Sequence, residues 1–207
     1  MIEANRRAAD LLPKMAARFG TMIPVPGESI FCLNNGDLFD LGNNQKLKII
    51  FTPGHQPSGI VILEQKNNGL FINDLVGEYL QDADDFFLVL TSSNTDVIDS
   101  MKSIQQLMEL NLTRLFLRHF GIVDQPKKIM KRALDGMQKL MDIGAECIKA
   151  GKPDDIITKV LAHKMIEMKK LRLSEERKDL YKYVRDELNT HHAEVFSKYY
   201  LSLKKCD

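Results

Sequence analysis

Apolar residues in the first half of the chain come in short runs that alternate with polar turn residues. Segments such as KLKIIF at 46–51 and GIVILE at 59–64 have the length and alternation of half-buried β-strands. Turn sequences rich in Asn and Gly, including NNGD and QKNNG, separate the runs, as they do in β-hairpins. The pattern therefore predicts neighbouring strands. The runs that follow it are 29–33, 37–41, 46–51, 59–64 and 69–74.

Helical spacing marks the N-terminus and returns after these strands. In residues 2–19 apolar positions recur at helical intervals, and Gly20 follows as a stop signal. Residues 95–110 carry a second apolar face, with Thr95 as the predicted N-cap. The run TRLFLRHF at 113–120 then predicts another strand. Because strand, helix and strand follow in this order, we expect a crossover connection and an α/β fold.

From Pro126 onward the pattern is wholly helical. Predicted helices begin at Pro126, near Pro153 and after Ser174, and a last one covers residues 195–203. Several of their apolar stripes are rich in methionine. Helical periodicity of this kind is typical of packing seams between helices, and we prefer that interpretation to a cofactor groove.

Composition narrows the class of protein without pointing to a partner. The 207 residues are 44% hydrophobic, which is enough to bury the core of a domain. A net charge of +1 provides no field to attract nucleic acid, so no nucleic acid partner is expected. Apolar runs fall short of the ~20 residues that cross a bilayer, and the charged N-terminus is unlike a signal peptide. Three cysteines without CxxC spacing fit free thiols, so we expect a cytoplasmic protein with no membrane partner.

Three polar residues stand where predicted apolar strands end. His55 follows the strand at 46–51, Asp74 follows GLFIN, and His119 follows TRLFLR. In open α/β sheets such strand ends gather ligands and catalytic groups. Two imidazoles and a carboxylate suit a borderline cation such as zinc. Each residue alone also has an ordinary explanation, since a histidine can lie in a loop or core and Asp74 can cap a turn.

The motifs around these residues resemble a known family. TPGH at 52–55, LFINDLVG at 70–77 and LFLRHFG at 115–121 are similar, in order and spacing, to the second half of the metallo-β-lactamase superfamily. The resemblance implies part of an αββα sandwich, with one mixed sheet and helices, over residues 1–125. Residues 126–207 would form an all-helical C-terminal extension.

The resemblance also implies a chemistry. His55 would ligate a first metal, Asp74 would bridge two metals and act in catalysis, and His119 would ligate the second metal. The metal would be zinc, with iron and manganese as alternatives. The family hydrolyses esters, thioesters, lactones, amides and phosphodiesters, so a small-molecule substrate is expected. Arg118, directly before His119, departs from the family pattern by placing a second cation near the metal position.

The family's His-x-His-x-Asp-His loop has no counterpart in this sequence. We therefore expect that the sequence begins after that loop and that the polypeptide is inactive alone. A single sheet would also expose an apolar face, which predicts a homo-oligomer or a separately encoded N-terminal half as partner. Two functions stay open: an incomplete metal-dependent hydrolase, or a non-catalytic remnant that serves self-association or partner binding.

The other histidines have no predicted role in the site. His163 is predicted to lie on a helix, at its surface or at a seam. His191 and His192 lie about 100° apart on a helix and do not face one another, so we expect them at a helix junction.

Overall fold

The computed structural model of this protein describes residues 25–80, 85–88, 90, 94–118, 121–170, 182 and 188–204. The chain divides into two units, Met1–Leu33 and Asn34–Asp207, and each is described by itself. The described part of the first unit contains the 3-10 turn η1 (Gly27–Ser29). The prediction of a strand at 29–33 is wrong. The amides of Ser29 and Ile30 donate to the carbonyls of Pro26 and Gly27 instead of to a neighbouring strand.

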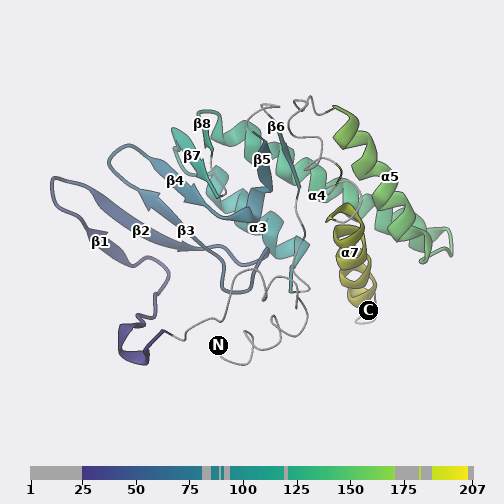
Figure 1. The fold of residues 1–207 in the computed structure, drawn as a ribbon, viewed down its shortest axis with the longest axis horizontal. Coiled ribbons are helices and arrows are strands. Elements are labelled where there is room, and N and C mark those ends of the chain that lie inside the picture. Colours follow the sequence, from purple (N-terminus) through teal and green to yellow (C-terminus); the bar gives the residue numbers. More distant parts are fainter. Residues whose placement is uncertain are drawn as a thin grey trace. The chain divides into compact units, whose positions relative to one another are not determined.

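Strands of the second unit form one six-stranded mixed sheet (Figure 1). Their order across the sheet is β1 (Leu38–Asp40), β2 (Lys46–Phe51), β3 (Ile60–Glu64), β4 (Gly69–Ile72), β7 (Arg114–Leu117) and β8 (Ile122–Val123). Neighbours are antiparallel except β4 and β7, which run parallel with Leu70 opposite Leu115. The hairpins predicted between 37 and 74 are therefore confirmed. The parallel pair confirms the predicted crossover and the α/β class.

The crossover between β4 and β7 carries several short elements and one long helix. In chain order these are η2 (Asp74–Val76), the paired strands β5 (Glu78–Leu80) and β6 (Asp85–Phe87), and α3 (Val97–Met108). Helix α3 was expected, but its N-cap is Asp96 and not Thr95. The Asp96 carboxylate accepts a hydrogen bond from the amide of Asp99 at 2.9 Å, which satisfies a free donor of the first turn.

Helices α4 (Pro126–Lys149), α5 (Asp155–Lys170) and α7 (Asn189–Leu203) follow the sheet. The predicted helix start at Pro126 and the predicted C-terminal helices are confirmed where the structure describes them. The predicted helices at 2–19 and after Ser174 lie outside the described residues. None of the helices in the described ranges is long and apolar enough to cross a membrane.

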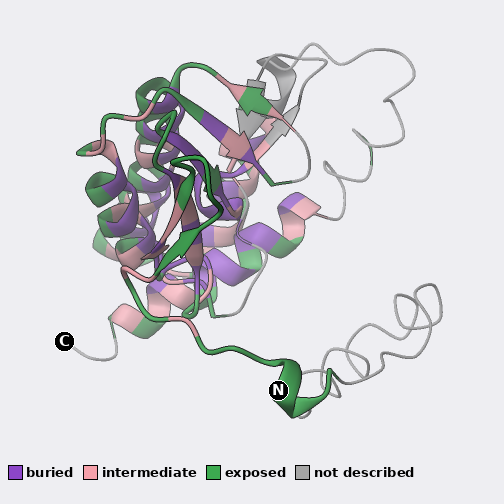
Figure 2. Ribbon diagram, turned by 90° about the vertical axis from the view of Figure 1, so that its left-hand side faces the viewer, coloured by how far each residue is buried: buried purple, intermediate pink, exposed green. Residues whose placement is uncertain are grey.

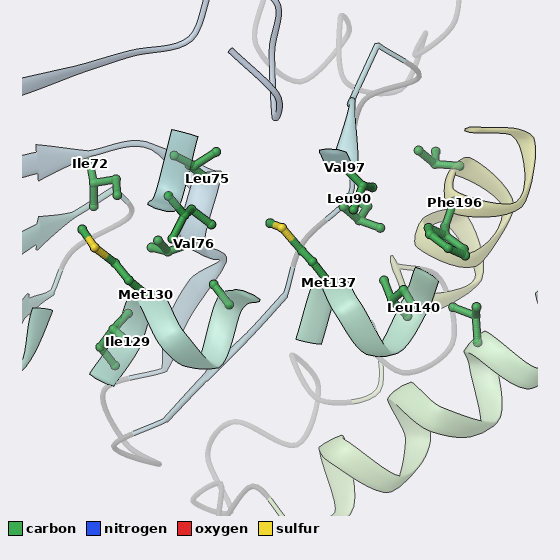
Figure 3. Close-up of a cluster of buried hydrophobic side chains, with 14 of the residues drawn as sticks. Ile72, Leu75, Val76, Leu90, Val97, Ile129, Met130, Met137, Leu140 and Phe196 are labelled. Carbon is green, nitrogen blue, oxygen red and sulfur yellow. The ribbon is translucent and has the colours of Figure 1, made fainter. Parts of the chain in front are cut away.

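One face of the sheet is covered by helices. Val61, Leu70 and Leu115 on this face belong to the same buried cluster as residues of α3, α4 and α7. Figure 3 shows Met130 of α4 extending into this cluster, and Met137 of the same helix also belongs to it, so the methionine-containing stripe of α4 is a packing seam, as predicted. The hydrophobic core thus includes residues from both sides of residue 125. The boundary expected there between the sheet domain and the helical extension stays a prediction.

The opposite face of the sheet carries apolar side chains, four of which are exposed, while the others are half-buried or, at Ile49, buried. Residues opposite each other on adjacent strands share a face, and the register places Phe71 beside Ile62 and Phe116. We call this surface the open face. Its apolar residues are Phe39, Leu47, Ile49, Phe51, Ile60, Ile62, Phe71, Phe116 and Ile122. Phe71 is 46% exposed and Ile122 is 60% exposed, and Figure 2 colours all of β1 as exposed.

Candidate functional site

The carboxyl ends of three strands meet at one edge of the sheet. β2 is antiparallel to β3, β3 is antiparallel to β4, and β4 is parallel to β7, so β2, β4 and β7 point the same way. His55, Asp74 and Arg118 each follow one of these strands. The topology therefore brings together the loops that carry the predicted site.

The loop that carries His55 is anchored on the start of α3. The carbonyl of Gly54 accepts a bond from the Asp96 amide at 2.7 Å, and the His55 carbonyl accepts one from the Thr95 hydroxyl at 3.2 Å. Ser103 donates to the Pro53 carbonyl at 2.7 Å. Gly54 has a φ of +137°, and a Cβ at this position would collide with the backbone of Ser100. These contacts fix the loop backbone and with it the position from which the His55 side chain starts.

Asp74 is held by the tight turn that ends β4. The Asn73 side chain accepts a bond from the Leu75 amide at 2.9 Å and donates to the Ile60 carbonyl at 3.1 Å. The Asp74 carbonyl accepts from the Gly77 amide at 3.0 Å, which closes η2. Asp74 is buried at the first position of this turn, so its carboxylate has little freedom.

His55 and Asp74 lie against each other in the buried part of the site. His55 Nε2 is 3.7 Å from Asp74 Oδ2, and both side chains are almost fully buried. Burial lowers the pKa of His55; the Asp74 carboxylate partly opposes this shift, and the Arg118 guanidinium adds to it. The imidazole is therefore neutral near pH 7, which leaves a nitrogen lone pair available to a metal or a proton.

Arg118 binds to the same carboxylate oxygen of Asp74. Its Nη1 donates to Asp74 Oδ2 at 2.9 Å, and its side chain is 57% exposed. The backbone amide of Arg118 donates to the Ile72 carbonyl, which fixes the start of its side chain beside β4. Sequence reasoning placed this cation near the site, but nothing in the sequence indicated that it bonds directly to Asp74.

The structure thus brings together two of the three predicted ligands. His119 lies outside the described residues, so its predicted role stays untested. Sequence reasoning missed the anchors Thr95 and Ser103, which act through hydrogen bonds across 40 and 50 positions of the chain. The one local signal was the capping pattern at the start of α3.

Comparisons with known proteins agree with this geometry. The chain is 29% identical over 113 residues to a β-lactamase-like protein 2 homolog of Caenorhabditis elegans, a match that covers 54% of this chain and 34% of that protein. An archaeal metallo-β-lactamase superfamily protein from Sulfolobus tokodaii superposes with a TM-score of 0.53 at 24% identity. That superposition covers 64% of this chain and 49% of the archaeal one. The chain has the metallo-β-lactamase fold.

A second solved structure with the metallo-β-lactamase fold extends the likeness over more of the chain. A metallo-β-lactamase family protein from Thermus thermophilus superposes with a TM-score of 0.51 at 12% identity, covering 96% of this chain and 60% of that one. The chain therefore spans about a third of the curated relative and about half to three fifths of these solved structures. No protein-family profile matches the sequence. The resemblance drawn from the TPGH and related motifs is confirmed at the level of the fold.

The metallo-β-lactamase fold implies a metal. The described residues include side chains of the types that bind a metal, but too few of them lie together to complete a site. A neutral imidazole and a carboxylate are typical zinc ligands, and His55 and Asp74 present them side by side. Within the described ranges, no group of three or more His, Cys, Asp or Glu side chains is placed to hold a metal ion. A complete site would need His119 and further ligands in addition to this pair.

Proposed function

We propose that this chain supplies the C-terminal half of a metal-dependent hydrolase of the metallo-β-lactamase superfamily. One observation carries the proposal: a neutral, buried His55 faces the Asp74 carboxylate at 3.7 Å where strands of a metallo-β-lactamase fold end. Such a pair has little value as a structural ion pair, because the histidine is uncharged near pH 7. A role as ligands gives both residues a reason to be placed there.

His55 and Asp74 would hold the metal together with His119 and with ligands from the remainder of the domain. Zinc is the metal we propose, with iron or manganese as alternatives, because imidazole and carboxylate ligands accept all of these. A bound metal would polarise a substrate carbonyl or phosphoryl group and activate water. The anchored loop and the η2 turn would keep the two side chains in place during that chemistry. The proposed substrates are small esters, thioesters, lactones, amides or phosphodiesters.

The remaining ligands would come from a polypeptide that packs on the open face. The matched structures extend well beyond the part that this chain covers, and the open face presents apolar side chains of the kind that pack between two sheets. We propose a separately encoded or directly preceding N-terminal half as this partner, with a second copy of the chain as the alternative.

Metal analysis tests the proposal. We expect the chain extended by the sequence encoded directly upstream to bind stoichiometric metal and to hydrolyse a generic phosphodiester or thioester. His55→Ala and Asp74→Asn should each weaken metal binding about 10-fold or more, since each removes a ligand. His191→Gln, a change at an exposed histidine, should leave it unchanged. An extended chain that binds no metal, or one indifferent to both ligand variants, would refute the proposal.

The second function, a non-catalytic partner-binding module, is favoured by Arg118. A guanidinium already bound to Asp74 is expected in a site that no longer holds a metal. The two functions differ in the upstream coding sequence. A His-x-His-x-Asp-His loop encoded there supports the enzyme, and its absence supports the module.

A further inference from the structure

We propose that the guanidinium of Arg118 takes the place of a metal cation at Asp74. The inference deepens the proposed function, because it concerns the same carboxylate, but it can be tested separately from it. The observation behind it is the shared oxygen. Asp74 Oδ2 is both the atom nearest to His55 Nε2 and the acceptor of the 2.9 Å bond from Arg118.

Burial explains why Asp74 needs a cation. Its side chain is 9% exposed, and a buried carboxylate without a positive partner or hydrogen bonds is strongly destabilising. Arg118 provides such a partner, because its guanidinium donates a 2.9 Å charge-assisted hydrogen bond to Asp74 Oδ2.

The position of Arg118 makes this substitution reversible. More than half of its side chain is exposed, so the guanidinium can turn into solvent without burying its charge elsewhere. A dication next to Asp74 would repel the guanidinium and compete with it for the lone pairs of Oδ2. Arg118 and a metal should therefore weaken each other's binding to Asp74.

Arg118→Gln in the full chain tests the inference, with Arg114→Gln as the matched control. Arg114 begins β7, the strand that Arg118 follows, and pairs with Asp124 at 3.5 Å, but both of those side chains are exposed. In EDTA, Arg118→Gln should lower the melting temperature by roughly 4 °C or more, and Arg114→Gln should leave it within about 1 °C. In a chromophoric chelator competition with the chain extended by the upstream sequence, Arg118→Gln should bind zinc at least about 10-fold more tightly than the same extended chain without the substitution.

A double variant separates a specific pair from a general loss of stability. In EDTA, adding Arg118→Gln to Asp74→Asn should cost little, because the charge that Arg118 balances is already gone. Additive losses would overturn the inference. An unmodified chain that binds zinc as tightly as Arg118→Gln would also overturn it while supporting the proposed hydrolase. Coupled losses without zinc binding by any variant, even with the upstream sequence, would confirm that Arg118 balances the charge of Asp74, but would overturn its competition with a metal and refute the metal-dependent function.

Discussion

His192 is a completely buried histidine on α7 that carries no positive charge in the native protein. Burial, together with electrostatic contributions from Lys164, His191 and His55, lowers its pKa to about 2. Neither ring nitrogen has a hydrogen-bond partner among the described residues. The unfolded chain has no such restriction, so its histidine binds a proton near pH 6.5.

This difference predicts that acid destabilises the protein through His192. The contribution of neutral His192 to the free energy of unfolding is fully present above pH 6.5. It is lost as the pH falls towards 2, because only the unfolded state binds the proton in that window. Between pH 6.5 and 4.5 the loss amounts to about 2.3 kcal/mol, because the unfolded histidine is already half protonated at pH 6.5. We expect His192→Leu to remove this part of the pH dependence, as measured from urea unfolding at both pH values.

His191→Gln is the matched control, because His191 is the exposed neighbour on the same helix. Its unfolding should keep the pH dependence of the unmodified chain. If His192→Leu retained the same slope, His192 would be accessible to protons in the native state and its burial on α7 would be contradicted.

At the scale of residues, the sequence could predict the position of a side chain where the order of the strands alone decides that position. His55 and Asp74 could be predicted because they follow strands whose carboxyl ends share an edge. The bond from Arg118 to Asp74 could not, since it depends on which way a long side chain turns. His192 was expected at a helix junction, and its full burial depends on packing that no local pattern reveals.

At the scale of elements, two glycines of α4 differ in what surrounds them. A Cβ on Gly136 would meet Leu88 at an ordinary 3.7 Å, whereas a Cβ on Gly144 would lie 2.8 Å from the ring of Tyr200 on α7. Gly144 is therefore the point where α7 approaches α4 closely. Gly136 lowers the stability of the helix, and no neighbouring atom is close enough to exclude the methyl group of an alanine there.

Alanine should act in opposite directions at these two positions. Gly136→Ala should raise the free energy of unfolding by about 0.5–1 kcal/mol, because alanine loses less backbone entropy in a helix. Gly144→Ala should lower it by about 1–3 kcal/mol, since the added methyl group overpacks against Tyr200. Urea unfolding of the two variants measures both changes. Equal effects would show that α7 does not pack on α4 at Gly144.

Secondary structure could be predicted well wherever the hydrophobic period was long or regular. The 24 residues of α4 and the alternating strands β2 and β3 are examples. The segment 29–33 was predicted wrongly, because five apolar-rich residues match a strand by composition while the backbone there bonds locally. Strand pairing, unlike periodicity, is a long-range property. Only the crossover rule gave the parallel pair of β4 and β7 in advance.

At the scale of the whole molecule, the open face is the feature that calls for a partner. Four of its aromatic or aliphatic side chains, Phe39, Phe51, Phe71 and Ile122, are more than 40% exposed. The helix-covered face of the same strands is fully buried at Leu70 and Leu115. An antiparallel sheet normally turns polar residues to water on its second face, so apolar residues there indicate a surface that becomes covered.

The isolated chain should therefore self-associate through this face when no other polypeptide covers it. Phe51→Thr combined with Phe71→Thr should shift the chain towards monomer in light scattering and reduce binding of an apolar dye. Threonine retains β-propensity, so the cost in stability should be about 1–2 kcal/mol, including the lost stacking of Phe71 on Phe116 at 4.5 Å. Leu70→Thr is the contrasting variant, because Leu70 lies on the covered face of β4, the strand that carries Phe71. It should cost about 3 kcal/mol or more and should not favour the monomer, because it alters the core and leaves the open face intact. A chain already monomeric and without dye binding would show that the open face is covered within the polypeptide itself, which would contradict the need for a partner there.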